Sequence, residues 1–347
     1  MNDRHDMHER LLFLLSPPRA GSTLLQRMLG SHAEIYTRDE PHMLTPLAYL
    51  GYHDRVDKAP YDHINSAEAI RGFVAALPNG EADYLDALRA YCDTLYGRML
   101  APAGRRYFLD KTPAYALVLP LLRQLYPRAR YVVLTRHPLA VMSSYANSFF
   151  DGDWRAAQAF NPVVNRYVPA LARLLRDPLP HVCQVGYEQL VREPAQELER
   201  IFTFLDLPND PGAVDYGERF EGSQSHGAAG SGDPIGVSAH KRPVAESVDK
   251  WALELLADPD KLALASEIAA SLDPDDVKIW GYDRDRLLEP VERARAAGKA
   301  GKVLKPKLNG FVLQRRIMLA LKKDIERRPH GRWLRRVRYY CDVLLRE

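Results

Sequence analysis

Arg19, Gly21 and Ser22 are the residues whose types and spacing most clearly indicate chemistry. They follow an apolar run at residues 11–15 and two prolines, and they precede an apolar-periodic segment, so the pattern predicts a buried strand, a tight turn and a helix. A helix start presents unpaired amides and the positive end of the helix dipole, and Arg19 adds a cation. Ser22 is expected to cap the helix. This combination is typical of a loop that binds a phosphate or sulfate group.

A second segment, residues 130–147, has the same order of strand, turn and helix. Arg136 lies where a strand at Tyr131–Thr135 is expected to end, and a helix is expected from about Leu139. Ser144 follows Arg136 by eight residues, a little over two helical turns, so both side chains can face the end of the sheet. Ligands of open parallel sheets bind outside the carboxyl ends of the strands. The two segments therefore predict one polyanion that spans both turns.

The elements that must position these residues alternate between short apolar strands and helical stretches. This order predicts an α/β fold, a three-layer sandwich around a central parallel sheet with right-handed crossovers. Strands are expected at Leu11–Leu15, Tyr107–Leu109, Tyr131–Thr135 and His181–Val185. Helices are expected at Ala67–Leu77, Tyr84–Met99, Ala114–Tyr126, Trp154–Leu175 and Ala195–Phe204.

With these two motifs and a third stretch, GYEQLVREP at residues 186–194, the chain resembles the sulfotransferases that use 3′-phosphoadenosine 5′-phosphosulfate (PAPS). It is most similar to the branch that contains tyrosylprotein sulfotransferases and the sulfotransferase domains of bacterial polyketide enzymes. The resemblance covers residues 10–251. It implies a P-loop-like sulfotransferase fold and a PAPS-dependent enzyme that transfers a sulfuryl group to a hydroxyl of an acceptor.

The same resemblance implies which residues hold the donor. The first loop would hold the 5′-phosphosulfate, the second loop the 3′-phosphate, and a tyrosine of the third stretch would lie against the nucleotide. The segment HKRPVAESVDKW resembles the part of the family that closes over the nucleotide, and a Gly- and Ser-rich stretch at 222–236 before it is expected to be a mobile lid that orders when PAPS binds. The implied donor-binding residues are Pro18, Arg19, Ala20, Gly21, Ser22, Thr23, Arg136, Ser144, Tyr187, Arg242 and Lys250.

Two further matches bear on the reaction. Glu40 follows Arg19 by 21 residues, where tyrosylprotein sulfotransferases keep their general base, and Lys111 in FLDKTP stands where they keep a lysine beside the bridging oxygen. Glu40 would take the proton of the acceptor hydroxyl, while Lys111 and Arg19 would neutralise charge on the bridging oxygen. His42 is the alternative base, since cytosolic members of the family use a histidine. A sulfuryl group carries less charge than a phosphoryl group, so no metal is expected.

Each assignment also has a structural interpretation, and two other functions stay open. Glu40 is a solvated loop carboxylate in that interpretation, Lys111 ends a strand, and Tyr187 belongs to the core. The other functions are a nucleotide-binding module without catalysis and a small-molecule kinase of the phosphate-loop type. The kinase hypothesis conflicts with the sequence, which lacks the lysine that GxxxxGK[ST] places directly before Ser22.

The composition is that of an ordinary soluble globular protein, with 347 residues of which 46% are hydrophobic and 27% charged. Three scattered cysteines indicate neither a disulfide framework nor a zinc site, and the polar start has no signal-peptide pattern, so a cytoplasmic location is expected. No nucleic-acid partner is expected. We expect a sulfotransferase domain at 1–290 and a basic helical extension at 291–347.

The expected extension differs from the rest of the chain in charge. Residues 293–347 hold 17 lysines and arginines against 4 acidic residues, whereas the preceding residues hold 31 against 41. A helix over 307–325 would carry basic residues between apolar ones, which is typical of binding to an anionic membrane surface or an acidic partner. The other interpretation, which we favour, is a charged helix packed on the same protein.

The acceptor pocket is the part that the sequence specifies least. The resemblance places it after Glu40 and after the second motif, where aromatic and apolar residues gather. These are Leu44, Leu47, Tyr49, Tyr52, Phe149, Phe150, Trp154 and Phe160. If they line a pocket, the acceptor has an apolar or flat body beside its hydroxyl; otherwise they belong to the core.

Overall fold

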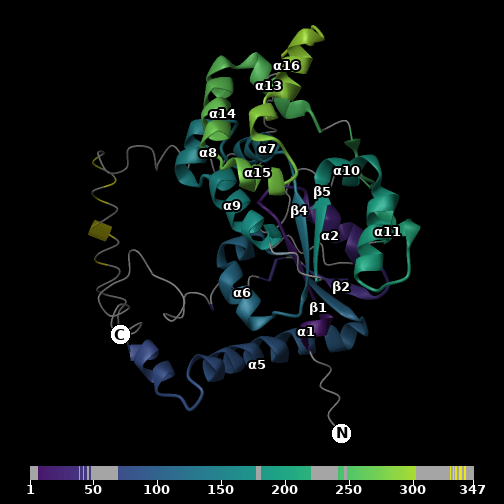
Figure 1. Ribbon diagram of the computed structural model, residues 1–347, viewed down its shortest axis with the longest axis vertical. Helices are drawn as coiled ribbons and strands as arrows, with labels where there is room; N and C mark the ends of the chain where they lie inside the picture. The colour runs from purple at the N-terminus through teal and green to yellow at the C-terminus, as the bar shows by residue number, and fades with distance from the viewer. Residues whose placement is uncertain are drawn as a thin grey trace.

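A computed structural model of the chain describes residues 7–38, 40–41, 43–44, 47, 69–176, 181–219, 241–245 and 248–301, with single positions between 329 and 340. At its centre, these residues form a five-stranded parallel sheet in the order β2-β3-β1-β4-β5 (Figure 1). The strands are β1 (Leu11–Leu15), β2 (Ile35–Thr37), β3 (Tyr107–Asp110), β4 (Arg130–Thr135) and β5 (Val182–Gly186).

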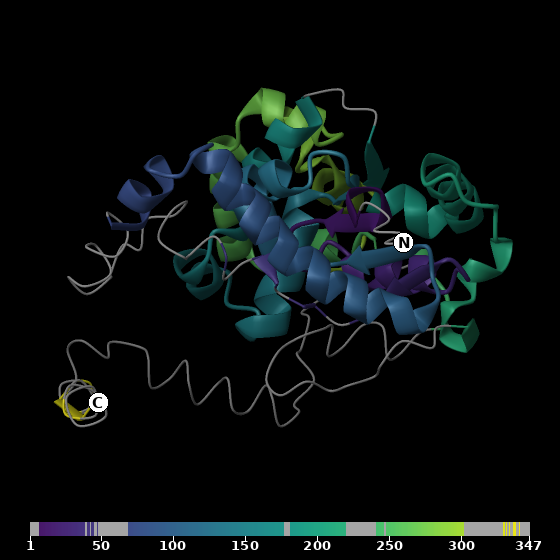
Figure 2. The same ribbon diagram turned by 90° about the horizontal axis from the view of Figure 1, so that it is seen from below.

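Helices surround the sheet, with α5 crossing below it and α13 to α16 above it in the view of Figure 1, and Figure 2 shows α5 along its length. The α-helices are α1 (Met7–Arg10), α2 (Ser22–Gly30), α5 (Glu81–Leu100), α6 (Leu119–Leu125), α7 (Pro138–Phe149), α8 (Trp154–Phe160), α9 (Val163–Arg176), α10 (Tyr187–Arg192), α11 (Pro194–Phe204), α12 (Tyr216–Arg219), α13 (Lys250–Ala257), α14 (Pro259–Ser271), α15 (Pro274–Ile279) and α16 (Glu289–Ala296). Short 3₁₀ helices are η1 (Ala101–Ala103), η2 (Pro113–Val118), η3 (Pro211–Val214) and η6 (Arg284–Arg286).

The central strand β1 shows why the molecule has three layers. All five of its side chains are fully buried, and successive side chains of a strand point to opposite faces. Phe13 and Leu15 join the core that packs against α5, α6, α7 and α9, whereas Leu12 and Leu14 join the core under α2, α10 and α11. A continuous apolar run is what a parallel strand covered on both faces requires. The predicted α/β sandwich is confirmed.

The order of the strands also sets where the loops lie. β1 pairs with β3 on one side and with β4 on the other, and Leu15 stands opposite Val133. The chain therefore leaves β1 toward one edge and returns at β4 toward the other edge. Such a reversal leaves a crevice at the carboxyl ends of the two strands, where open α/β sheets bind ligands.

Two predicted helices are each divided in two. The helix expected at Trp154–Leu175 is α8 and α9, with Asn161 and Pro162 between them. A proline disfavours the helical conformation of the residue before it, so α8 ends at Phe160. The helix expected at Ala114–Tyr126 is η2 followed by α6. Pro120 lies in the first turn of α6, where the amide hydrogen that proline lacks would have no partner within the helix.

One strand was not predicted, and one predicted boundary falls inside a helix. β2 has three residues, which is too short for a clear alternating pattern, and it pairs Ile35 with Tyr107 of β3. Helix α16 runs across the boundary predicted between residues 290 and 291, and its Val291 is 1% exposed. Within the described ranges no helix is both long enough and apolar enough to cross a membrane.

Candidate active site

The loop after β1 and the loop after β4 meet at the carboxyl end of the sheet. Nε of Arg19 donates to Oγ of Ser144 at 3.4 Å, and Nη1 of Arg136 donates to the carbonyl oxygen of Arg19 at 2.9 Å. These contacts join positions 125 and 117 residues apart. The structure therefore brings together the three side chains that two separate motifs singled out, and it collects two guanidinium groups beside the start of α2.

The backbone of the first loop is bent by two left-handed residues. Arg19 has a φ of 69° and Gly21, which directly precedes α2, has a φ of 100°. The expected cap by Ser22 is wrong, because Gly21 occupies the capping position and Ser22 is the first residue of the helix, with no side chain capping it. The amides of the first turn have no acceptor within a helix, so here they stay available to a bound anion.

Tyr187 fills the space between the two loops. A Cβ added to Gly21 would lie 2.5 Å from Cδ2 of Tyr187, so the tyrosine ring packs directly on the glycine. The guanidinium carbon of Arg136 lies 4.2 Å from the centre of the same ring, in cation–π geometry. Tyr187 is 8% exposed and is the first residue of α10. The third predicted motif thus contacts both of the others.

Glu40 and Lys111 form an ion pair at the neighbouring strand ends. Nζ of Lys111 lies 2.5 Å from Oε1 of Glu40, and the two side chains are 2% and 16% exposed. Lys111 directly follows β3, which lies between β1 and β2, and Glu40 follows β2 by three residues. Glu40 is therefore not a solvated loop carboxylate.

Asp110, the last residue of β3, fixes the position of Lys111, and the sequence reasoning did not single it out. Asp110 is fully buried, and its carboxylate accepts hydrogen bonds from the hydroxyls of Tyr96 at 2.7 Å, Tyr115 at 3.1 Å and Thr112 at 2.9 Å. Burial of a carboxylate is costly unless its oxygens are hydrogen-bonded. The signal in the sequence was a carboxylate that ends an apolar strand beside a lysine.

The other side of the ion pair is anchored in the same way. The hydroxyl of Tyr115 accepts the amide hydrogen of Leu44 at 3.1 Å, four residues after Glu40. Burial raises the pKa of Tyr115 well above its ordinary value, so this hydroxyl stays protonated. Before Glu40, Nε2 of Gln26 donates to the carbonyl oxygen of Arg38 at 2.7 Å. Buried partners therefore hold the backbone on both sides of Glu40.

Two tryptophan side chains contact the residues of the second loop. The indole of Trp280 donates to the carbonyl oxygen of Arg136 at 2.9 Å, and His137 stacks on Trp251 at 4.3 Å. The amide of His137 donates to Glu188 at 3.1 Å. Burial, with help from the charge of Arg136, lowers the pKa of His137 to about 3. The imidazole is therefore neutral beside the guanidinium at neutral pH.

The remaining predicted positions are less closely connected to the two loops. Arg242 pairs with Asp215 at 2.5 Å, and its side chain is 67% exposed. Lys250 is the exposed first residue of α13. His42 and the predicted lid at 222–236 lie outside the described residues. Among the first-loop residues, Ala20 and Ser22 are buried, whereas Pro18, Gly21 and Thr23 are partly exposed.

Most of the proposed acceptor residues that the structure describes are part of the core. Leu44, Leu47, Phe150 and Trp154 are at most 8% exposed and belong to the main hydrophobic cluster. Phe149 is partly exposed, with the guanidinium carbon of Arg19 5.9 Å from its ring centre. Phe160 is 54% exposed, and Tyr49 and Tyr52 lie outside the described residues.

A cavity of about 740 Å³ opens beside the second loop. Thr135, His137 and Glu188 line it, whereas Arg19 and Ser144 do not, so it is separate from the place where the two loops meet. In the part of the chain that the structure describes, no three histidine, cysteine, aspartate or glutamate side chains are grouped to hold a metal ion.

Known proteins match this chain in sequence. The model of a family described as "Sulfotransferase family" matches residues 12–211. The chain is 32% identical over 226 residues to nodulation protein NoeE of Sinorhizobium fredii. The matched region covers 59% of this chain and 51% of that protein. It is 22% identical over 222 residues to protein-tyrosine sulfotransferase A of Caenorhabditis elegans, which covers 60% of this chain and 53% of that protein. The chain thus spans about half the length of these curated relatives.

Solved structures match it as well. The sulfotransferase domain from the curacin biosynthetic pathway is 25% identical with a TM-score of 0.51, over 76% of this chain and 98% of that chain. The sulfotransferase domain from the Synechococcus PCC 7002 olefin synthase is 28% identical with a TM-score of 0.49, over 76% and 95%. The first of these matches agrees with the parallel α/β sheet described above.

The contact between Gly21 and Tyr187 predicts that Gly21→Ala is destabilising. The added Cβ would collide with the tyrosine ring, and a left-handed alanine adds about 1–2 kcal/mol of backbone strain. We expect the free energy of unfolding, measured by chemical denaturation, to fall by more than that strain. Gly104→Ala is the matched control, because Gly104 has a φ of 61° and its Cβ would meet nothing within 4 Å. Equal losses in the two variants would contradict the packing role of Gly21.

Burial of the His137 imidazole predicts that this side chain stays neutral in the folded chain near neutral pH. Since the pKa of His137 is about 3 in the folded chain and 6.5 in the reference state, only the unfolded chain takes up this proton between those pH values. As pH falls through that window, the group lowers the free energy of unfolding by about 1.4 kcal/mol per pH unit. We expect the His137 resonance in an NMR titration, assigned by its loss in His137→Phe, not to shift above pH 5. A midpoint near pH 6 would show that the imidazole is not buried as described.

Proposed function

The chain belongs to the sulfotransferase family, and we propose that it is a PAPS-dependent enzyme that moves a sulfuryl group from PAPS to a hydroxyl of an acceptor. One observation carries the proposal. Arg19, Ser144 and Arg136 converge beside the start of α2, and the pair of Glu40 and Lys111 lies at the neighbouring strand ends. Sulfuryl transfer from PAPS requires a site that binds the two anionic groups of the donor and removes the proton of the acceptor hydroxyl.

The two loops suit the two anionic groups of the donor. The first-turn amides of α2 and the guanidinium of Arg19 suit the 5′-phosphosulfate, and Arg136 and Ser144 suit the 3′-phosphate. Among the described residues, Nε of Arg136 is buried without a hydrogen-bond partner, so it has a donor left for a phosphate oxygen. Tyr187 would lie against the nucleotide. The other donor-binding positions in this proposal are Pro18, Ala20, Gly21, Ser22, Thr23, Arg242 and Lys250.

The chemical step follows from the roles of two side chains. The acceptor oxygen forms a bond to sulfur in line with the bond from sulfur to the bridging phosphate oxygen, which breaks. Glu40 accepts the proton of the hydroxyl, and Lys111 neutralises the negative charge that grows on the bridging oxygen. In the structure these two side chains form an ion pair with each other, with Nζ of Lys111 2.5 Å from Oε1 of Glu40. Substrate binding would therefore separate them, and Lys111 would exchange a carboxylate for the leaving group.

For the acceptor, the cellular location and the partners, the proposal names general properties and no specific molecule. An acceptor with an apolar or flat body would suit the partly exposed ring of Phe149 beside Arg19. The cytoplasmic location stays a prediction from the sequence. The basic extension at 291–347 stays a candidate for contact with a membrane surface or an acidic partner, and its described positions include Trp333, 63% exposed, and Tyr340, 60% exposed.

If Glu40 is the base, Glu40→Gln removes the proton acceptor but no phosphate contact. We expect kcat to fall by about 10²- to 10⁴-fold, measured by transfer of labelled sulfate from PAPS to a hydroxyl library. The affinity for adenosine 3′,5′-bisphosphate should stay near that of the wild type, which also checks that the variant is folded. His42→Asn is the matched control and should keep most of the activity. An active Glu40→Gln together with an inactive His42→Asn would assign the base to His42.

If Arg136 holds the 3′-phosphate, the chain distinguishes nucleotides by that group. We expect the wild type to bind adenosine 3′,5′-bisphosphate more tightly than AMP, and without magnesium, as measured by calorimetry. Arg136→Ala should weaken bisphosphate binding by about 10- to 100-fold and leave AMP binding nearly unchanged, because it removes charge-assisted hydrogen bonds to one phosphate.

Arg130→Ala is the control for this experiment. Arg130 is the first residue of β4, the strand that Arg136 follows. Its guanidinium donates to the carbonyl oxygen of Phe204, so the nucleotide preference should persist in Arg130→Ala. Tighter binding of magnesium ATP than of the bisphosphate would favour the kinase instead. Bisphosphate binding without transfer to any acceptor would favour a binding module without catalysis.

A further inference from the structure

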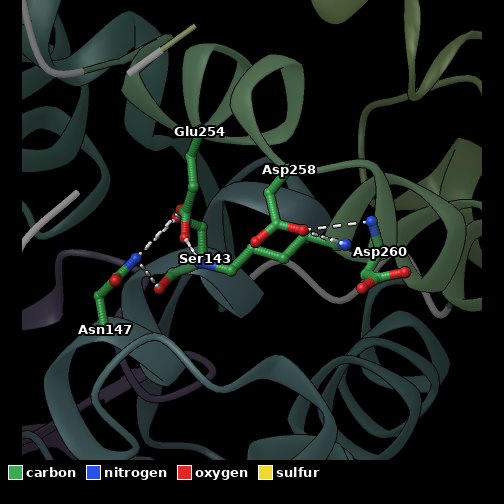
Figure 3. Close-up of polar contacts among 6 residues, drawn as sticks. Ser143, Asn147, Glu254, Asp258 and Asp260 are labelled. Carbon is green, nitrogen blue, oxygen red and sulfur yellow. Dashed lines mark hydrogen bonds and ion pairs between the residues drawn. The ribbon is translucent and has the colours of Figure 1, made fainter. Parts of the chain in front are cut away.

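A buried carboxylate, that of Glu254 in α13, joins three helices behind the second loop. Glu254 is 1% exposed. Its Oε2 accepts hydrogen bonds from Oγ of Ser143 at 2.5 Å and from Nδ2 of Asn147 at 3.0 Å, both in α7. Its Oε1 pairs with Nζ of Lys261 in α14 at 2.6 Å. Figure 3 shows Ser143 and Asn147 pointing toward Glu254, and Asp258 capping the helix that carries Lys261.

The helix that carries Glu254 contacts the second loop at one place and α7, the helix that follows this loop, at another. Trp251, three residues earlier in α13, stacks on His137, which directly follows Arg136. Glu254 itself bonds to Ser143, which directly precedes Ser144. Helix α13 is therefore fastened next to both residues that the proposed function assigns to the 3′-phosphate.

The direction of neighbouring side chains makes this connection specific. Successive residues of an α-helix point about 100° apart, so Ser143 and Ser144 face different neighbours. Ser143 faces Glu254, and Ser144 faces Arg19 at 3.4 Å. A rotation of α7 that breaks the first contact also moves Oγ of Ser144 away from the loop. The oxygen of the Asn147 amide is buried without a partner among the described residues, so this amide is held only through its nitrogen.

The energetics argue that stability alone does not explain the cluster. Apolar residues of similar volume often replace a buried ion pair without loss of stability, because the desolvation of both charges offsets their attraction. Hydrogen bonds that a carboxylate accepts fix the direction of the donor side chains, which apolar packing does not. We propose that Glu254 is a positioning residue, which holds α7 so that Ser144 and Arg136 together recognise the 3′-phosphate of the donor. This inference rests on the proposed function.

The test compares two double variants that differ in a single residue. Glu254→Gln with Lys261→Met removes both charges and keeps one side-chain oxygen as acceptor for Ser143 and Asn147. Glu254→Leu with Lys261→Met removes both charges and the acceptor. The measurement is the ratio of the dissociation constants for AMP and adenosine 3′,5′-bisphosphate, by calorimetry well below each melting temperature. We expect the ratio to stay within about twofold of wild type in the Gln variant and to fall about tenfold in the Leu variant.

A control separates positioning from a general loss of stability. Asp276 is 6% exposed and pairs with Arg176 at 2.5 Å, so Asp276→Asn breaks a comparable ion pair that links α15 to α9 without touching α7. Its melting temperature should fall while its nucleotide ratio stays unchanged. If the Leu variant does not fold, Ser143→Ala removes one of the same hydrogen bonds and should lower the ratio by about threefold.

The outcomes distinguish this inference from the proposed function. A wild-type chain that binds the bisphosphate no more tightly than AMP would overturn both. A wild-type chain that prefers the bisphosphate, with a folded Leu variant or Ser143→Ala of equal preference, would overturn the role of Glu254 alone. A preference lost equally in the Gln and Leu variants would assign the effect to charge rather than to the direction of the hydrogen bonds, and would also overturn it.

Discussion

The parallel pairing of β1 with β4 is the constraint on which the candidate site depends. With Leu15 opposite Val133, β4 continues only two residues beyond the end of β1, so the loops that follow the two strands leave the same edge of the sheet side by side. Parallel strands require long crossovers, so the two loops come from segments far apart in the chain. Buried side chains on both faces of β1 hold the sheet in this register, because a shift by one residue would exchange the faces. The arrangement of cations is thus a consequence of core packing.

Concentrating cations at one end of a sheet has a cost, and the chain offsets it internally. Lys111 is paired with Glu40, and Arg136 donates to the carbonyl oxygen of Arg19 and lies over the ring of Tyr187. Each contact gives a cation a partner, and under the proposed function the anionic donor would replace that partner. The scaffold below is fixed more firmly, by a fully buried carboxylate at Asp110 on one side and by the cluster around α13 on the other. Replaceable contacts around the cations and fixed contacts beneath them are what a preorganised site requires.

Local sequence patterns specified the layers of the fold better than the ends of its elements. Four of the five strands could be predicted, because continuous apolar runs bounded by turn residues are clear signals over four to six residues. β2 could not be, since three residues carry no period and only pairing with β3 makes them a strand. The break between α8 and α9 could be predicted from Pro162, because a proline disfavours the helical conformation of the residue before it. The apolar pattern continues across this proline, however, and by itself predicts a single helix.

The sequence by itself determined which residue types stand at the strand ends: a glycine and an arginine after β1, an arginine after β4 and a lysine after β3. Only the tertiary structure decided which of them meet. The tyrosine ring on Gly21, the carboxylate of Glu40 on Lys111 and the two serine-containing contacts of α7 each join segments 71 or more residues apart. No local period records such pairs, because they arise when strands take their places in a sheet and helices pack over it. Residue chemistry is local, whereas the geometry that makes it a site is set by long-range packing.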